Sequence, residues 1–559
     1  MKYSLLMTLL APALLAGCNL EKKEEPFQAR HIRTGYDAGQ VCQQLRQGWQ
    51  EDGIAIPASQ VSCHYLTVPL DYDKEWVQIK ETKWEKRSAA RADSSLFADN
   101  SPRFSSWSDK PIRPHVKQET RTVKGDTLDI FYLHYRASGD YRGTLFYNPG
   151  GPTSATPDLG LLLDMLRSAN PAILEHYDIV TLDPRGAGYS ALGHELRSCL
   201  LTDKQGVRPD MSPAQLAQLF ASRDKGALPA LQSGADQGKA FSTALLERCD
   251  EPLRPHAPHL GSRAVVEDME RLRQHLGRER ITPITFSYGT RLAALYAARY
   301  PSHVANLVVD SPMSPAENRY PAIFRGDAEN ANRILAWRFG DQALQRSMAV
   351  TRQVRDNGRY VDNQGNVLNR ASWVAVLGDA ISGSQRDDQL AFWQQDDAGP
   401  LLARLAGQDD DNPYQELQEM PFFSAIHCTD NSEPYGWQGL DPEDAAFQGA
   451  GALLLAKSFN TCADWPYPRQ PIASYGAGEI KLPDDARALV LGAEYDPNTP
   501  FAGARQMQAA FSSAARMVQV AQSNQHGQLN SSRCAQAALS TLLLGDGASL
   551  PAEQRCLAD

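Results

Sequence analysis

The chain of 559 residues is 42% apolar and 22% charged, which excludes a disordered protein and fits about three to four domain-sized units or one large α/β domain with an insertion. The formal charge of −10 excludes a dominant basic surface, so no nucleic-acid partner is expected. No apolar run reaches the ~20 residues of a membrane-spanning helix, which excludes a multi-span membrane protein.

The N-terminus has the layout of a secretory signal peptide. Lys2 gives a positive start, an apolar run covers residues 5–15, and small residues lead up to Cys18. A buried first helix is the competing interpretation, but Pro12 and the charged stretch after Leu20 disfavour it. Export from the cytoplasm is therefore expected.

The sequence Leu-Ala-Gly-Cys that ends at Cys18 also resembles the bacterial lipobox. The resemblance implies that residues 1–17 are removed, that Cys18 carries a lipid, and that residues 18–39 form a tether. Asn19 follows the lipidated position, which by the same resemblance implies the outer membrane, facing the periplasm, in a Gram-negative cell. The expected location is thus the bacterial cell envelope, with the lipid as the contact to the membrane.

Eight of the nine cysteines remain if Cys18 carries the lipid. An even number of cysteines in an exported chain indicates disulfides, although their spacing leaves many pairings open. Pairing each cysteine with its nearest neighbour along the chain gives Cys42–Cys63, Cys199–Cys249, Cys428–Cys462 and Cys534–Cys556. Neither a CxxC pair nor zinc-type spacing occurs, so no metal site is expected.

Strands alternate with helices over much of the chain, which predicts a mostly parallel sheet flanked by helices, the α/β class. Residues 40–312 are expected to form the first part of this core, but within them residues 73–125 are polar and predict a long loop or insertion. The predicted strands cover residues 65–70, 129–135, 143–147, 177–182, 281–286, 304–309 and 487–492, and two helices cover residues 263–276 and 291–300.

Residues 313–475 interrupt the alternation of strands and helices. They are helix-prone and rich in Asp, Gln, Arg and Ala, which favours a helical cap inserted into the sheet domain. A separate third domain is the alternative interpretation. Residues 476–559 then return to the pattern of the core and complete it.

A strand that ends at Ser287 is followed at once by a helix, which is the setting of a nucleophile elbow. Gly289 satisfies the need for a small residue two positions after the serine, whereas Thr285 stands where the G-x-S-x-G motif has its first glycine. A serine that merely caps the helix N-terminus is the alternative interpretation.

A serine nucleophile needs a base, and the base needs a carboxylate that orients it. Of the histidines after Ser287, His303 lies too close along the chain and His427 adjoins a cysteine in the cap, which leaves His526. Asp496 follows the last predicted strand before His526 and is the expected acid, with Asp310 as its rival.

Acyl transfer also needs backbone N–H groups directed at the developing oxyanion. The Gly-Gly turn in residues 148–152 follows a strand and allows a close approach, so Gly151 is one expected donor. The residue after the nucleophile, Tyr288, supplies the other. A simple turn is the alternative interpretation of residues 148–152.

Five motifs occur in one order, and together they resemble the α/β-hydrolase serine peptidases of the prolyl and tripeptidyl aminopeptidase kind. The resemblance implies an α/β-hydrolase fold with an inserted, mainly helical cap, a C-terminal segment of the tripeptidyl aminopeptidase type, and no cofactor. The motifs are Asn-Pro-Gly-Gly-Pro (148–152), Asp-Pro-Arg-Gly-x-Gly-x-Ser (183–190), Ser-Tyr-Gly-Thr (287–290), Asp-Pro-x-Thr-Pro (496–500) and His-Gly (526–527).

By this resemblance the chain removes short peptides or single residues from peptide N-termini, with Ser287, Asp496 and His526 as the triad. Acidic residues of the cap would hold the substrate ammonium, and Asp430, Glu433 and Asp464 are the candidates near the cap cysteines. An esterase or lipase with the same triad and a non-catalytic, peptide-binding surface lipoprotein are the alternatives. The oligomeric state stays open.

Overall fold

The computed structural model describes the chain in two units, each of which is treated by itself. The smaller unit comprises Met1–Arg30 and Asp73–Gly125, and the larger one His31–Tyr72 and Asp126–Asp559. The predicted signal peptide and the lipid site at Cys18 lie outside the described residues. The described residues are 28–54, 56–85, 115–200, 231–383, 386–406, 413–434, 440–441, 443–457 and 462–559.

The larger unit is built on a mostly parallel sheet in the order β1-β5-β7-β6-β8-β9-β12-β13-β14, with β2 paired to β5. Within this sheet, as far as the structure describes it, only the pairs β2–β5 and β5–β7 are antiparallel. The strands are β1 His31–Ile32, β2 Val61–Pro69, β5 Thr127–Tyr135, β6 Gly143–Asn148, β7 Tyr177–Leu182, β8 Thr282–Phe286, β9 Leu307–Asp310, β12 Ala488–Ala493, β13 Ala515–Ala521 and β14 Glu553–Leu557. The strands predicted from the sequence are all present, with ends shifted by a few residues.

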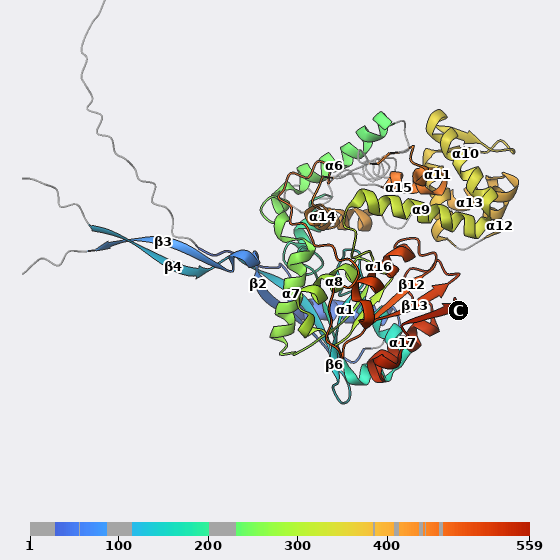
Figure 1. The fold of residues 1–559 in the computed structure, drawn as a ribbon. Helices are drawn as coiled ribbons and strands as arrows, with labels where there is room; N and C mark the ends of the chain where they lie inside the picture. The colour runs from blue at the N-terminus through green and yellow to red at the C-terminus, as the bar shows by residue number, and fades with distance from the viewer. Residues whose placement is uncertain are drawn as a thin grey trace, which may run out of the picture. The chain divides into compact units, whose positions relative to one another are not determined.

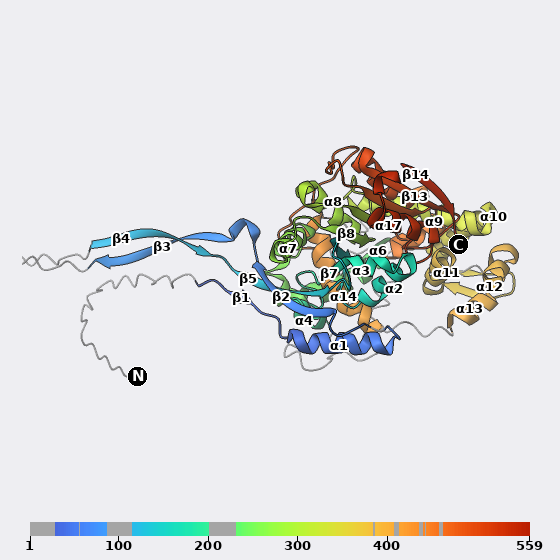
Figure 2. The same cartoon turned by 90° about the horizontal axis from the view of Figure 1, so that it is seen from below.

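Helices cover both faces of this sheet (Figures 1 and 2). Apolar side chains of α1, α2, α3 and α17 form one buried cluster with the strands, and those of α7, α8 and α16 form another on the opposite face. None of the helices in the described residues combines the length and apolarity that crossing a bilayer requires. The bounds are α1 Ala38–Glu51, α2 Leu159–Ala169, α3 Ala172–His176, α4 Gly193–Ser198, α6 Leu231–Leu253, α7 Ser262–His275, α8 Gly289–Arg299, α16 Phe501–Phe511 and α17 Arg533–Leu544.

The chain between β9 and β12 is mainly helical and carries its own buried cluster around Trp373, Phe392 and Trp393. Helices α9 to α13 and α15 lie together in Figure 1, whereas α14 packs its apolar residues into the core of the sheet domain. The elements are α9 Tyr320–Phe339, α10 Asp341–Asn357, β10 Arg359–Val361, β11 Val367–Asn369, α11 Arg370–Ser382, α12 Asp387–Leu390, α13 Gly399–Ala406, α14 Pro413–Asp430 and α15 Ala452–Lys457.

The smaller unit contains a two-stranded antiparallel ribbon of β3 Trp76–Glu85 and β4 His115–Lys124. The prediction of a long loop over residues 73–125 is wrong for these two segments. A ladder of backbone hydrogen bonds does not require the alternation of apolar and polar side chains that marks a half-buried strand, so the polar sequence gave no strand signal.

The eight cysteines of the described residues form the four nearest-neighbour disulfides: Cys42–Cys63, Cys199–Cys249, Cys428–Cys462 and Cys534–Cys556. The first joins α1 to β2, the second joins the end of α4 to α6, and the third holds the C-terminal turn of α14. Such local bridges stabilise a chain chiefly by restricting its unfolded state.

The Asp-Pro-Arg-Gly motif contributes a fully buried ion pair to the core. Arg185 makes two hydrogen bonds to Asp268 of α7, at 2.8 and 2.6 Å, and both side chains are 0% exposed. Arg185 also donates to the carbonyl oxygens of Pro69 and Leu70 at the end of β2. The pair therefore joins the loop after β7 to helix α7, and Arg185 also joins that loop to the end of strand β2.

We predict that Asp268→Asn lowers the free energy of unfolding by about 3–5 kcal/mol, because it leaves the Arg185 guanidinium buried without its counter-charge. Asp164→Asn removes a carboxylate from the exposed pair with Arg167 and should cost less than about 1 kcal/mol. Urea denaturation of both variants measures the difference. Equal losses in the free energy of unfolding would show that the buried pair contributes no more to stability than the exposed one.

Candidate active site

Ser287 lies in a sharp turn between β8 and α8. Its φ is 51°, in the left-handed region that non-glycine residues rarely adopt. The N–H of Ser287 donates to the carbonyl of Asp310 at 3.0 Å, and the carbonyl of Ser287 accepts from Thr290. The turn therefore holds a strained serine at the end of the strand, as in a nucleophile elbow.

The neighbours of Ser287 show which residues the elbow tolerates. A β-carbon on Gly289 would come within 2.5 Å of the Asn148 side-chain oxygen, so a larger residue does not fit there. Thr285 fits at the other position because its side chain is buried and its hydroxyl donates to the carbonyl of Val308 on β9, at 3.1 Å. The threonine is thus satisfied within the sheet and does not crowd the serine.

Asp496 and His526 form a hydrogen-bonded pair. The Nδ1 of His526 lies 3.0 Å from both carboxylate oxygens of Asp496. Asp496 is 1% exposed and also accepts from the N–H groups of Asn498 and Thr499 at 2.9 and 3.0 Å. The N–H of Tyr495 donates to the carbonyl of Ser523, which ties the loop of the acid to the loop of the base.

The surroundings of His526 raise its pKa above the usual 6.5. Burial by itself lowers the pKa, but the hydrogen bond to Asp496, the charge of Asp496 and the charge of Asp310 outweigh it. The carboxylates thus stabilise the imidazolium that forms when the histidine takes a proton from a nucleophile.

Asp310, the rival acid, is not hydrogen-bonded to the imidazole in this structure. It is fully buried at the end of β9, where its carboxylate accepts from the N–H groups of Gln528 and Leu529, each at 2.8 Å. Burial raises its pKa to about 6, although the two hydrogen bonds act to lower the pKa. Asp310 therefore holds the chain just after His526, while Asp496 orients the ring.

The Gly-Gly turn lies directly against the elbow. Gly150 has a φ of 107°, and a β-carbon there would come within 2.7 Å of the Phe286 carbonyl and 2.8 Å of the Ser287 β-carbon. Gly151, with a φ of 93°, lines the cavity together with Ser287 and Tyr288. The sequence pointed to Gly151 as a donor, and the structure adds Gly150 as the residue whose lack of a side chain permits the contact.

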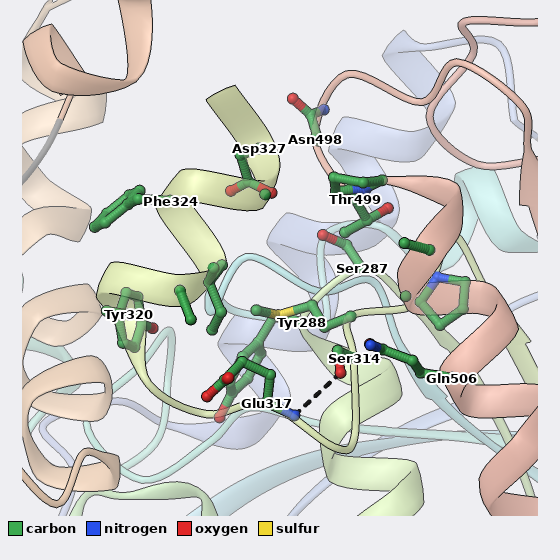
Figure 3. A pocket seen from close by; sticks show the side chains of 18 of the residues that line it. Ser287, Tyr288, Ser314, Glu317, Tyr320, Phe324, Asp327, Asn498, Thr499 and Gln506 are labelled. Carbon is green, nitrogen blue, oxygen red and sulfur yellow. Dashed lines mark hydrogen bonds between the residues drawn. The ribbon is translucent and has the colours of Figure 1, made fainter. Parts of the chain in front are cut away.

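A cavity of about 550 Å³ opens in front of Ser287. Gly151, Ser287, Tyr288 and His526 line it from the sheet domain. The cap supplies aromatic side chains to the cavity wall, those of Tyr320 and Phe324 on α9 (Figure 3) and that of Phe423 on α14. A mostly apolar cavity with a few convergent polar groups is typical of a site for a small organic ligand or peptide.

The three acidic residues expected to bind the substrate ammonium do not line this cavity. Asp430 is 1% exposed and accepts from the N–H and the hydroxyl of Ser262, at 2.8 and 2.5 Å, so both of its oxygens are engaged within the protein. Glu433 and Asp464 are exposed to solvent. Their proximity to the cap cysteines in sequence does not bring them to the cavity in space.

Two other carboxylates line the cavity, Glu317 and Asp327. Glu317 is paired with the Arg319 guanidinium, whose hydrogen bond lowers the pKa of the carboxyl group. Asp327 on α9 points into the space in front of Ser287 (Figure 3), and burial together with the charge of Asp496 raises its pKa to about 8. Asp327 lies in a helix without any motif, so the sequence offered no signal for it.

The two other histidines after Ser287 do not pair with a catalytic carboxylate. His303 lies 3.1 Å from Glu270. His427 lies against the rings of Tyr288 and Phe423, and burial, followed by the charge of Arg291, lowers its pKa to about 3. Within the described residues, no group of His, Cys, Asp and Glu side chains is arranged to hold a metal ion.

The chain belongs to the α/β-hydrolase family, because a family model described as alpha/beta hydrolase fold matches residues 143–531. The predicted fold class is thereby confirmed. The pair of Asp496 and His526, the strained Ser287 and the adjoining Gly-Gly turn all fall within the matched range.

Three relatives are similar over most of the chain. Tripeptidyl aminopeptidase of Streptomyces coelicolor is 24% identical over 422 residues, which cover 69% of this chain and 71% of that protein. Serine protease Hip1 of Mycobacterium tuberculosis is 24% identical over 416 residues, covering 67% and 74%. Carboxylesterase B of the same organism is 26% identical over 417 residues, covering 67% and 73%. The peptidases among them confirm the resemblance drawn from the motifs and the prediction of a serine peptidase.

We predict that labelling of Ser287 by a fluorophosphonate accelerates as the pH rises, with a midpoint above 6.5. The imidazole of His526 accepts the serine proton only when it is neutral, and the raised pKa moves that condition to higher pH. Asp496→Asn should lower the labelling rate by roughly 10⁴-fold, since the ring loses its orienting carboxylate. A wild-type midpoint below 6.5 would contradict the pairing.

Proposed function

We propose that the protein is an exported serine aminopeptidase that releases short peptides or single residues from the free N-termini of peptides. The observation that carries the proposal is the arrangement in one cavity of the elbow serine, the base of the His526–Asp496 pair, and a cap carboxylate, Asp327. Peptidases among the relatives support the reaction class.

The reaction proceeds by acyl transfer. The Ser287 hydroxyl attacks the carbonyl carbon of the scissile peptide bond while His526 takes the hydroxyl proton, and the N–H groups of Gly151 and Tyr288 accommodate the oxyanion. His526 then gives the proton to the leaving amine as the C–N bond breaks. Water, with His526 again as the base, hydrolyses the resulting ester of Ser287 and regenerates the enzyme.

Asp327 gives the reaction its preference for a free N-terminus. Within the described residues, its carboxylate has neither a hydrogen-bonding nor an ionic partner, and it faces the cavity. A substrate ammonium at this position would form a charge-assisted pair in a site of low dielectric constant. An acetylated N-terminus carries no charge and would leave the carboxylate unpaired.

A carboxylesterase is the second candidate, because carboxylesterase B is similar over a comparable share of the chain. The triad serves ester hydrolysis equally well, so the substrate-binding part of the cavity decides between the two.

We predict that wild-type protein cleaves a peptide naphthylamide with a free amine and fails on its Nα-acetylated form. Ser287→Ala should lower turnover by roughly 10⁴–10⁶-fold. Equal rates on both substrates would favour the esterase.

We further predict that Asp327→Asn raises the KM for free peptides with a small effect on p-nitrophenyl acetate. In the wild-type protein the affinity for free peptides should be highest near pH 8. At lower pH the Asp327 carboxyl is protonated, since its pKa is about 8, and at higher pH the substrate amine loses its charge, with a usual pKa of about 7.7–8.0. Glu317→Gln is the matched control, because Arg319 already neutralises that carboxylate.

Export and anchoring through Cys18 are part of the same proposal. The lipobox-like sequence and the four disulfides, which persist in oxidising compartments, support it. Metabolic labelling with a palmitate analogue tests it: the wild-type chain should incorporate the label and sediment with membranes, and Cys18→Ser should do neither. A labelled Cys18→Ser chain would place the lipid elsewhere.

A further inference from the structure

A buried chain of hydrogen bonds runs from the cap to the residue after the nucleophile. The hydroxyl of Tyr288 lies 2.6 Å from the hydroxyl of Ser262, and the Ser262 hydroxyl donates to the Asp430 carboxylate at 2.5 Å. The second oxygen of Asp430 accepts from the N–H of Ser262 at 2.8 Å. All three side chains are at most 2% exposed, so water does not compete for these bonds.

The direction of the chain follows from the charge at its end. Asp430 as a carboxylate only accepts, so Ser262 must direct its hydroxyl proton to Asp430 and use its lone pair for Tyr288. Tyr288 is therefore the donor to Ser262. Burial and the charge of Asp430 raise the pKa of Tyr288, which keeps its phenol protonated.

The local backbone is built around this carboxylate. Helix α7 begins at Ser262 without a side-chain cap of its own, and Asp430 of α14 takes that place from a distant part of the sequence. A β-carbon on Gly261 would come within 2.8 Å of the Asp430 carboxylate, so glycine is what permits the approach. The backbone of Asp430 in turn accepts from the N–H of Ile472.

We propose that Asp430 is a positioning residue that acts through Ser262 on Tyr288 and thereby fixes the Tyr288 amide at the oxyanion site. The inference rests on the proposed function, in which that amide is an oxyanion donor. Ser287 precedes Tyr288 in a strained turn, so an anchored ring limits how far the turn can relax. Asp430 thus serves the transition state without touching the substrate.

The test compares Asp430→Asn with Thr429→Val. Asparagine has an NH₂ group in place of one carboxylate oxygen, so one of the two Ser262 donors loses its acceptor and the chain to Tyr288 loses the charge at its end. Thr429 is the adjacent buried residue, and its hydroxyl anchors the same end of α14 to the carbonyl of Ala257 at 3.0 Å without joining the chain to Tyr288. Both variants disturb the cap, but only one disturbs the elbow.

We expect Asp430→Asn to lower kcat and the rate of fluorophosphonate labelling by roughly 10- to 100-fold with little change in KM, since a small displacement of a catalytic group has that order of effect. Thr429→Val should lower the melting temperature without changing kcat. An equal loss of kcat in both variants, or a loss confined to KM in Asp430→Asn, would overturn the proposal.

Tyr288→Phe provides a second variant that keeps the ring and removes only its hydroxyl. It should lower kcat by a similar factor, and combining it with Asp430→Asn should add little, because both changes break one chain. Independent, multiplicative effects would overturn the chain. Labelling needs only a reactive Ser287, so wild-type protein that labels but does not cleave peptides would refute the aminopeptidase and leave this inference standing.

Discussion

The left-handed conformation of Ser287 is the constraint on which the rest of the site depends. Such a conformation costs about 1–3 kcal/mol and persists only where its surroundings enforce it. Here the N–H of Ser287 is held by the Asp310 carbonyl, and Gly150 and Gly289 bring neighbouring backbone into contact with the turn. The strained conformation of Ser287 therefore requires residues without side chains at positions 150 and 289.

The second requirement is topological. The carboxyl ends of adjacent parallel strands meet at one edge of the sheet, so loops after β6, β8, β9, β12 and β13 converge although they are far apart in sequence. Asp310 lies where these loops converge and makes two contacts there. Its carbonyl accepts from the N–H of Ser287, and its carboxylate accepts from the N–H of Gln528, just after His526. Ser287 and the chain just after His526 are thus both held by Asp310 at the end of β9.

The sequence predicted the parts of the site that depend on local geometry. Ser287 and Asp496 each follow a predicted strand, and a strand that ends in a tight polar turn is visible without knowledge of the fold, whereas His526 follows from elimination among the histidines after Ser287. The cavity carboxylates were not predictable in this way. Asp327 faces the cavity because of how α9 packs. Asp430 lies near a cap cysteine in sequence, which favoured a place at the cavity, but in the structure it is buried against Ser262.

The cap contacts the machinery at two separate points. On α9 the Asn330 side chain donates to the carbonyl of Asp496 at 2.7 Å, one turn along from Asp327, while on α14 Asp430 reaches the elbow through Ser262. The same two helices supply aromatic side chains to the cavity wall. A change in the cap that reshapes the cavity wall therefore also acts on the loop of Asp496 and on the turn at Ser287, so the shape of the cavity and the geometry of the candidate site are not independent in this fold.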